Sequence, residues 1–168
     1  MKKWHYIFLI FLVPALSNCE RGDEFPNEPV ITAIDFDDAN SDLIIEFTDG
    51  DGDYGIEAED PDFPYYLDDD STEVNPYYFN LWIDYYELRD GEWVFIEPES
   101  EAGFNFRVPN LTPDGQNKQL EVIFTNDMST ELPYLLAESD TIKFRVTLVD
   151  RAKNESVPEE TSAIYMPR

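Results

Sequence analysis

The amino-acid sequence predicts an all-β domain, an antiparallel β-sandwich of about seven to eight strands. Three observations predict this class. Short runs rich in β-branched and aromatic residues alternate with clusters of Pro, Gly, Asn and Asp, as strands alternate with turns. Residues 141–149 alternate apolar and polar side chains over nearly their whole length. After residue 18, no comparable stretch has the period of an amphipathic helix.

The strands are expected one after another, with a hairpin near the middle of the chain. Asp90-Gly91 favours a two-residue type I′ turn, which places Leu88 opposite Trp93 and Tyr86 opposite Phe95. Seven or eight strands in about 135 residues fit an immunoglobulin-like sandwich. The expected strands are residues 30–36, 43–48, 77–89, 92–97, 104–108, 120–125, 141–149 and 162–166.

The first residues have the pattern of an export signal. Lys2 and Lys3 precede an apolar run that is too short to be a resident membrane span. Leu-Ser-Asn-Cys at 16–19 then resembles the lipobox of bacterial lipoproteins, although Asn18 stands where Gly or Ala is usual. Cleavage after Ser17 is the alternative. Since Cys19 is the only cysteine, we expect it to carry the lipid that anchors the protein to the outer membrane or cell surface.

This reading divides the chain into three parts. Residues 1–18 form the signal peptide, residues 19–28 a lipidated acidic tether, and residues 29–168 the sandwich domain. Loss of the signal leaves 9 basic and 37 acidic residues, a formal charge of −28. Nucleic acid is therefore excluded as a partner, because phosphate contacts need clustered Lys and Arg. The expected partners are the membrane, through the lipid, and a glycan or another surface protein.

Composition also restricts the chemistry of the mature chain. The single histidine, His5, is lost with the signal, and the single cysteine is used for the lipid. This excludes Ser-His and Cys-His nucleophiles and the usual zinc, copper, haem and iron–sulfur sites. Carboxylate chemistry and oxygen-preferring metals remain. We therefore expect a protein that is not an enzyme. A hydrolase that works with paired carboxylates alone is a weaker alternative.

One segment has the composition of a calcium loop. Residues 49–53 read Asp-Gly-Asp-Gly-Asp, so that three carboxylates alternate with residues that allow the backbone to curl around an ion. Asp49, Asp51, Asp53 and Asp60 fall at positions one, three, five and twelve of the EF-hand pattern. An EF-hand is rejected, because a strand precedes the loop and Tyr54 replaces the glycine at position six. These four carboxylates are the predicted calcium ligands, and the alternative is a solvated Asp-Gly turn.

The expected hairpin suggests a second candidate site. Trp82, Tyr86 and Trp93 fall on one face of the sheet, interleaved with polar residues. Such rings form a platform on which a sugar stacks, which would suit a glycan-binding module of a polysaccharide-uptake system. The alternative is a second packing layer of aromatic side chains.

Three segments of the mature chain resemble recurrent blocks of Bacteroidota surface lipoproteins. They are residues 47–55, residues 107–113 with Asn117-Lys118, and residues 150–156. The resemblance implies an immunoglobulin-like sandwich at the cell surface and no established activity. Together with the composition, it predicts a membrane-anchored surface lipoprotein that acts as a non-catalytic, calcium-stabilised binding or accessory module.

The anchor can be tested in cells. The Cys19→Ser variant should remain unprocessed or be released, because it lacks the sulfur that accepts the lipid. Detergent-phase partitioning of the two proteins measures the difference. Recovery of the wild-type protein from the medium, with Asn18 as its first residue, would contradict the lipoprotein interpretation.

Overall fold

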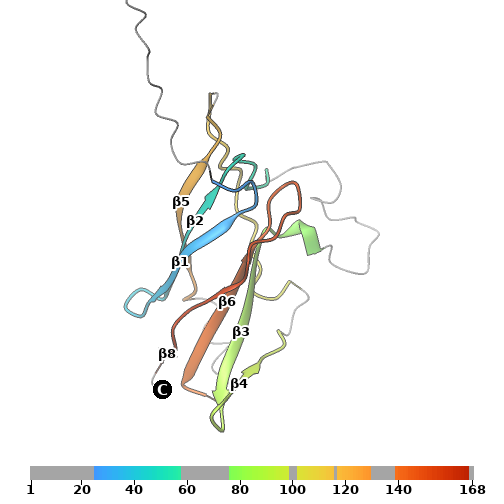
Figure 1. Cartoon of the computed structure of the whole chain (residues 1–168). Helices are drawn as coiled ribbons and strands as arrows, with labels where there is room; N and C mark the ends of the chain where they lie inside the picture. The colour runs from blue at the N-terminus through green and yellow to red at the C-terminus, as the bar shows by residue number, and fades with distance from the viewer. Residues whose placement is uncertain (1–24, 58–75, 99–101, 116, 130–138, 167–168) are drawn as a thin grey trace, which may run out of the picture.

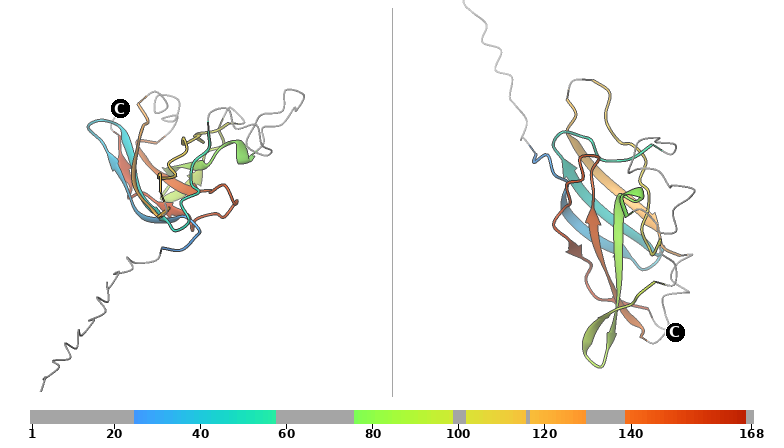
Figure 2. Two further views of the ribbon diagram at one scale, coloured as in Figure 1. Left: turned by 90° about the horizontal axis from the view of Figure 1, so that it is seen from above. Right: turned by 90° about the vertical axis from the view of Figure 1, so that its right-hand side faces the viewer.

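The computed structural model is an all-β, immunoglobulin-like sandwich, as predicted: two antiparallel sheets pack face to face (Figure 1). Figure 2 shows the two sheets from two further directions. The structure describes residues 25–57, 76–98, 102–115, 117–129 and 139–166. Within these ranges, no helix has the length and apolar character needed to cross a membrane.

The first sheet has the strand order β1-β2-β5. Its strands are β1 (Val30–Asp37), β2 (Asp42–Asp49) and β5 (Leu120–Asp127). Ile45 of β2 pairs with Ile34 on one side and with Phe124 on the other. Alternate residues of β2 are buried, and the last three residues of the strand are all buried. The end of β2 therefore lies inside the molecule, which is where the predicted metal loop begins.

The second sheet has the order β4-β3-β6-β7, and β8 also pairs with β6. The Asp90-Gly91 turn is confirmed, since both residues have positive φ angles, of 53° and 85°. The predicted hairpin register also holds. The strands are β3 (Leu81–Arg89), β4 (Glu92–Phe95), β6 (Thr141–Leu148), β7 (Glu159–Glu160) and β8 (Ile164–Tyr165).

The core lies between the two sheets and is built from their inward-facing residues. In β6 the buried side chains alternate with half-buried ones along the whole strand, as the sequence predicted. Tyr85 and Phe144 from paired positions pack with their ring centroids 5.9 Å apart. The largest fully buried apolar side chains are Tyr54, Tyr85, Phe47, Phe144, Leu43, Ile45, Ile56, Leu81, Met128, Ile142 and Leu148.

The expected strand at 104–108 is wrong, because this segment makes only an isolated bridge between Phe106 and Leu81. It runs along the edge of β3 beyond the end of β4. There the Asn105 Oδ1 accepts the backbone N–H of Ile83 at 3.0 Å, so a side chain replaces a ladder hydrogen bond. The start of the third expected strand is also wrong: residues 76–78 form a short 3₁₀ turn, η1 (Pro76–Tyr78).

Buried Asn80 explains why β3 begins late. Its amide Nδ2 donates to the Val108 carbonyl at 3.0 Å, and its Oδ1 accepts the Val108 N–H at 2.6 Å. The Asn80 side chain thus takes both backbone hydrogen bonds of Val108. In a regular ladder, the backbone of a paired strand would make these bonds.

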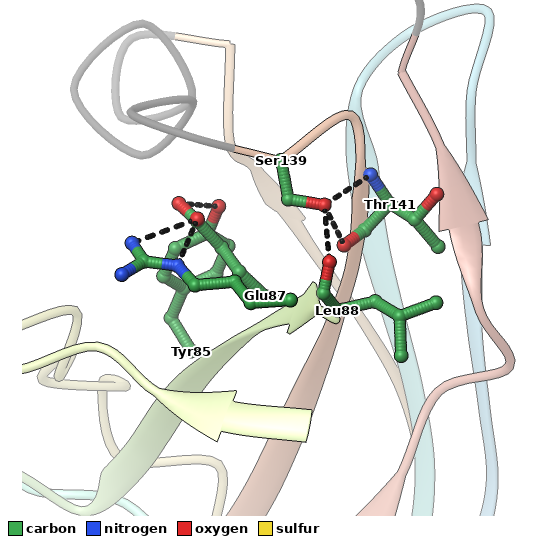
Figure 3. A network of polar contacts seen from close by, with 6 residues as sticks. Tyr85, Glu87, Leu88, Ser139 and Thr141 are labelled. Atoms are coloured by element: carbon green, nitrogen blue, oxygen red, sulfur yellow. Dashed lines mark hydrogen bonds and ion pairs between the residues drawn. The ribbon is translucent and has the colours of Figure 1, made fainter. Parts of the chain in front are cut away.

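One buried carboxylate in the core receives its partners from the same strand. Glu87 is fully buried, and its Oε1 accepts the Tyr85 hydroxyl at 3.1 Å (Figure 3). Its Oε2 lies 2.9 Å from an Arg89 guanidinium nitrogen. Nearby, the Ser139 hydroxyl donates to the Leu88 carbonyl at 2.8 Å (Figure 3). A buried charge is tolerated here because a cation and hydrogen bonds compensate it.

Removing the cation should expose the cost of this buried charge. Arg89→Gln should lower the free energy of unfolding by about 2 to 3 kcal/mol, since the buried Glu87 carboxyl would lose its cationic partner. Glu92→Gln, which removes an exposed charge opposite Arg89, should change it by less than about 0.5 kcal/mol. Urea unfolding measures both values, and equal losses in the two variants would contradict this account.

Candidate metal site

Three carboxylates from two distant parts of the chain meet at one end of the sandwich. Asp49 is the last residue of β2, Asp53 lies in the loop after it, and Asp150 follows β6 by two residues. One carboxylate oxygen from each lies within 4.8 Å of the other two. Since β2 and β6 belong to different sheets, the cluster joins the two layers of the fold.

The loop after β2 curls because of its glycines. The Gly52 N–H donates to the Asp49 Oδ1 at 2.7 Å, and Gly52 has a φ of 67°, where a side chain would be strained. A Cβ at Gly52 would also collide with the Lys118 carbonyl. The Thr112 hydroxyl donates to the Gly52 carbonyl at 2.7 Å, which fixes the loop from outside. A glycine at position 52 is thus required by the packing of this loop.

Asp150 is oriented by its own turn. Its Oδ1 accepts the Asn154 backbone N–H and its Oδ2 accepts the Asn154 Nδ2, both at 2.7 Å. The turn closes through Lys153, whose φ is 69° and whose N–H donates to the Asp150 carbonyl at 3.1 Å. The Arg151 N–H reaches the Asp53 carbonyl at 3.4 Å, which links this turn to the loop after β2.

Two buried oxygens of the cluster have no hydrogen-bond partner among the described residues. Asp49 has no exposed surface, and within that part of the chain its Oδ2 accepts no hydrogen bond. The Asp53 Oδ1 is also buried without a partner. Burying an ionised carboxylate oxygen without compensation costs several kcal/mol, so native proteins pair such groups or coordinate them to metal. Both atoms therefore have the unsatisfied acceptor capacity of metal ligands.

The electrostatics of the ion-free cluster are unfavourable. Burial, together with the neighbouring Asp51 and Asp53 carboxyls, raises the pKa of Asp49 to about 7, although the hydrogen bond from Gly52 lowers it. Burial and the charge of Asp150 raise the pKa of Asp53 to about 6. Burial likewise raises the pKa of Asp150. The fold thus holds three carboxylates where their charges are costly, and a cation would relieve that cost.

The donor set fits a hard divalent cation. Calcium takes six to eight oxygen ligands from carboxylates, carbonyls and water, with flexible geometry. Three carboxylates would supply the charge, and water and backbone carbonyls the remaining positions. Soft metals need imidazole or thiolate ligands, and the described residues contain neither histidine nor cysteine.

The structure brings together part of the predicted ligand set and adds one member. Asp49 and Asp53 lie in the cluster. Asp51 is exposed and is not among the three convergent residues, but its carboxyl lies beside Asp49 and Asp53 and raises the pKa of both, through side-chain hydrogen bonding and through its charge. Asp60 lies outside the described residues. Asp150 was not predicted as a ligand, and its sequence signal was only that an acidic turn follows the best-patterned strand.

The three blocks that carry the lipoprotein resemblance converge on this site. The loop after β2 belongs to the first block and Asp150 opens the third. The second block packs along the loop: the Leu111 N–H donates to the Tyr54 carbonyl at 3.3 Å, and the Ile56 N–H donates to the Val108 carbonyl at 3.0 Å. Residues far apart in sequence thus form one structural unit around the carboxylates.

The structure separates the residues of the expected aromatic platform. The Trp82 indole N–H donates to the Phe79 carbonyl at 3.2 Å, and its ring lies 6.2 Å from that of Tyr77. Tyr86 and Trp93 lie further along the hairpin. The Lys143 Nζ sits 5.3 Å from the ring centroid of Tyr86 and 4.9 Å from that of Trp93.

This arrangement resembles a packing layer. The Asp84–Arg145 ion pair, 2.5 Å long, comes from the stretch of β3 between Trp82 and Tyr86. The Lys143 ammonium covers a face of both Tyr86 and Trp93, and it is itself paired with Glu160 at 2.6 Å. The ring surface left for a stacked sugar is correspondingly smaller.

Comparison with known proteins adds no family to this geometry: no protein-family model, curated protein or solved structure matches the chain. Cys19 lies outside the described residues. The functional argument therefore depends on the sequence and on the site itself.

The unfavourable charge of Asp49 predicts that the stability difference between Asp49→Asn and the wild-type protein changes sign when calcium is added. Without metal, the folded state binds a proton on Asp49 more tightly than the unfolded state, so stability should fall as pH rises from about 4 to 7. In EGTA at pH 7.5, Asp49→Asn should therefore be more stable than wild type by about 1 to 3 kcal/mol. At pH 4 the difference should shrink, because Asp49 is already protonated.

In millimolar calcium the order should reverse, since the variant loses a ligand. Exposed Asp38 provides the control, and Asp38→Asn should show no reversal. Chemical denaturation at each pH measures these differences. An Asp49→Asn variant less stable than wild type in EGTA at pH 7.5 would contradict the electrostatic account.

Proposed function

We propose that this protein is a lipid-anchored surface lipoprotein whose sandwich is a non-catalytic binding or accessory module stabilised by one calcium ion. Asp49, Asp53 and Asp150 would hold the ion. The observation that carries the calcium assignment is the Asp49 Oδ2, a fully buried carboxylate oxygen with no hydrogen-bond partner that lies among two further carboxylates. The lipid anchor is supported by the sequence around Cys19.

Calcium suits this position better than magnesium. Magnesium demands near-ideal octahedral geometry and keeps several waters, so it favours open sites with one or two carboxylates. Here two of the three carboxylates are buried and the third is half-buried. An ion in this place would have a structural role, since it would tie the end of β2 to the turn after β6 across the two sheets.

The proposed binding role is supported by the β3–β4 hairpin. All four residues of β4 are exposed, and Trp93, Val94 and Phe95 are half of the large exposed hydrophobic residues of the described structure. Val94 lies on the opposite face of the hairpin from the other two. Exposed apolar side chains on both faces of an edge strand favour another surface protein as the partner. A glycan is less favoured, because Lys143 covers the rings of Tyr86 and Trp93.

Calcium should stabilise the mature domain. At 100 times its dissociation constant, a ligand that binds only the folded state adds about 2.7 kcal/mol, which raises the melting temperature of a domain of this size by several degrees. We expect millimolar calcium to raise the melting temperature, EGTA to lower it, and magnesium to act less.

Asp150→Asn should abolish the calcium-dependent shift, because it removes a ligand from the second sheet. Asp114→Asn removes an exposed carboxylate from the segment that packs on the metal loop, and it should retain the full shift. Differential scanning calorimetry at matched ionic strength measures both. Identical melting curves of the wild-type protein in calcium and in EGTA would overturn the proposed site.

A further inference from the structure

The first described residues of the chain pack directly against the metal loop. The Gly50 N–H donates to the Pro26 carbonyl at 2.7 Å. The packing is so close that a Cβ at Gly50 would collide with the carbonyl oxygens of Phe25 and Pro26. Gly50 stands directly after Asp49. The residue next to the buried Asp49 carboxylate is therefore also the residue on which Phe25 and Pro26 pack.

The carboxylate cluster and this attachment point are mechanically connected. Without a cation, Asp49, Asp53 and Asp150 hold three carboxylate oxygens within 4.8 Å of one another, so their negative charges repel. A displacement of the Asp49 backbone by about 1 Å carries Gly50 with it and takes a 2.7 Å hydrogen bond beyond the usual range. A cation can be held by all three carboxylates only while they lie together. It therefore stabilises the arrangement in which they converge, including the contact between Gly50 and Pro26.

We propose that occupancy of the metal site controls the docking of Phe25 and Pro26, and thereby fixes the direction in which the N-terminal segment leaves the sandwich. This inference rests on the proposed calcium site. It adds that the ion regulates the junction between the domain and its anchor. By thermodynamic linkage, a docked segment must also strengthen calcium binding by the same factor.

Docking of Phe25 and Pro26 would set how the domain is oriented relative to its N-terminal attachment. The chain enters the sandwich near the end of β2, whereas the β3–β4 hairpin lies at the opposite end of the molecule (Figure 1). With Phe25 and Pro26 docked, a protein anchored through its N-terminus would present the exposed hairpin away from the anchor. With Phe25 and Pro26 released, this constraint on the direction of the domain would be lost.

Amide hydrogen exchange of the mature chain, with Cys19→Ser in place of the lipid site, tests the coupling. In calcium, we expect the Gly50 amide, which donates to the Pro26 carbonyl, to exchange at least about tenfold more slowly than in EGTA, and the amides of Phe25, Asn27 and Glu28 to slow with it. Calorimetric titration with calcium chloride is run in parallel. If calcium binds and these amides do not change, the inference is overturned and the calcium site stands. If no calcium binds, both are overturned.

A variant tests the reciprocal effect. Gly50→Ala places a Cβ against the two carbonyls, so we expect weaker calcium binding, by about tenfold or more, and fast exchange of the amides of residue 50, Phe25, Asn27 and Glu28 even at saturating calcium. Gly91→Ala is the control: it strains a positive-φ turn in the distant hairpin, where a Cβ meets nothing within 4 Å. It should leave calcium affinity and exchange unchanged. Wild-type affinity and protection in Gly50→Ala would refute the coupling.

Discussion

The buried carboxylate of Asp49 is the constraint on which this end of the molecule depends. Asp49 is the last residue of β2, its Oδ1 accepts a hydrogen bond from the loop that follows, and its Oδ2 has no hydrogen-bond partner among the described residues. Three neighbouring features hold this buried carboxylate in place. They are the glycines that curl the loop, the turn that orients Asp150, and the hydrogen bond from Thr112 to the Gly52 carbonyl. The fold closes over a negative charge that its own hydrogen bonds do not neutralise.

The same sandwich contains a second buried carboxylate, Glu87, whose charge is compensated by neighbouring side chains. Glu87 lies in β3 beside Arg89 and the Tyr85 hydroxyl, so its charge is compensated within one strand. Asp49 instead faces two further carboxylates. At Glu87, the chain thus supplies a cation of its own for a buried carboxylate. Leaving Asp49 beside two other acids is consistent with compensation by an external cation.

Local patterns in the sequence accounted for most of the fold and for part of the site. Period-two alternation and Asp90-Gly91 predict β6 and the hairpin, because strand faces and two-residue turns are set by neighbouring residues. Asp49 and Asp53 were found by the same kind of local spacing. Asp150 lies about 100 residues away, and only the packing of the two sheets brings it to the loop. The failed strand at 104–108 depended on Asn105, whose side chain replaces a ladder bond.

The central claim is that a calcium ion completes this cluster. Diffraction from crystals grown in calcium, with data collected for the anomalous signal of calcium, tests it most directly. The account predicts one anomalous peak per chain, 2.3 to 2.6 Å from oxygens of Asp49, Asp53 and Asp150. A water molecule in that position, or a calcium ion bound only to exposed carboxylates elsewhere, would contradict it.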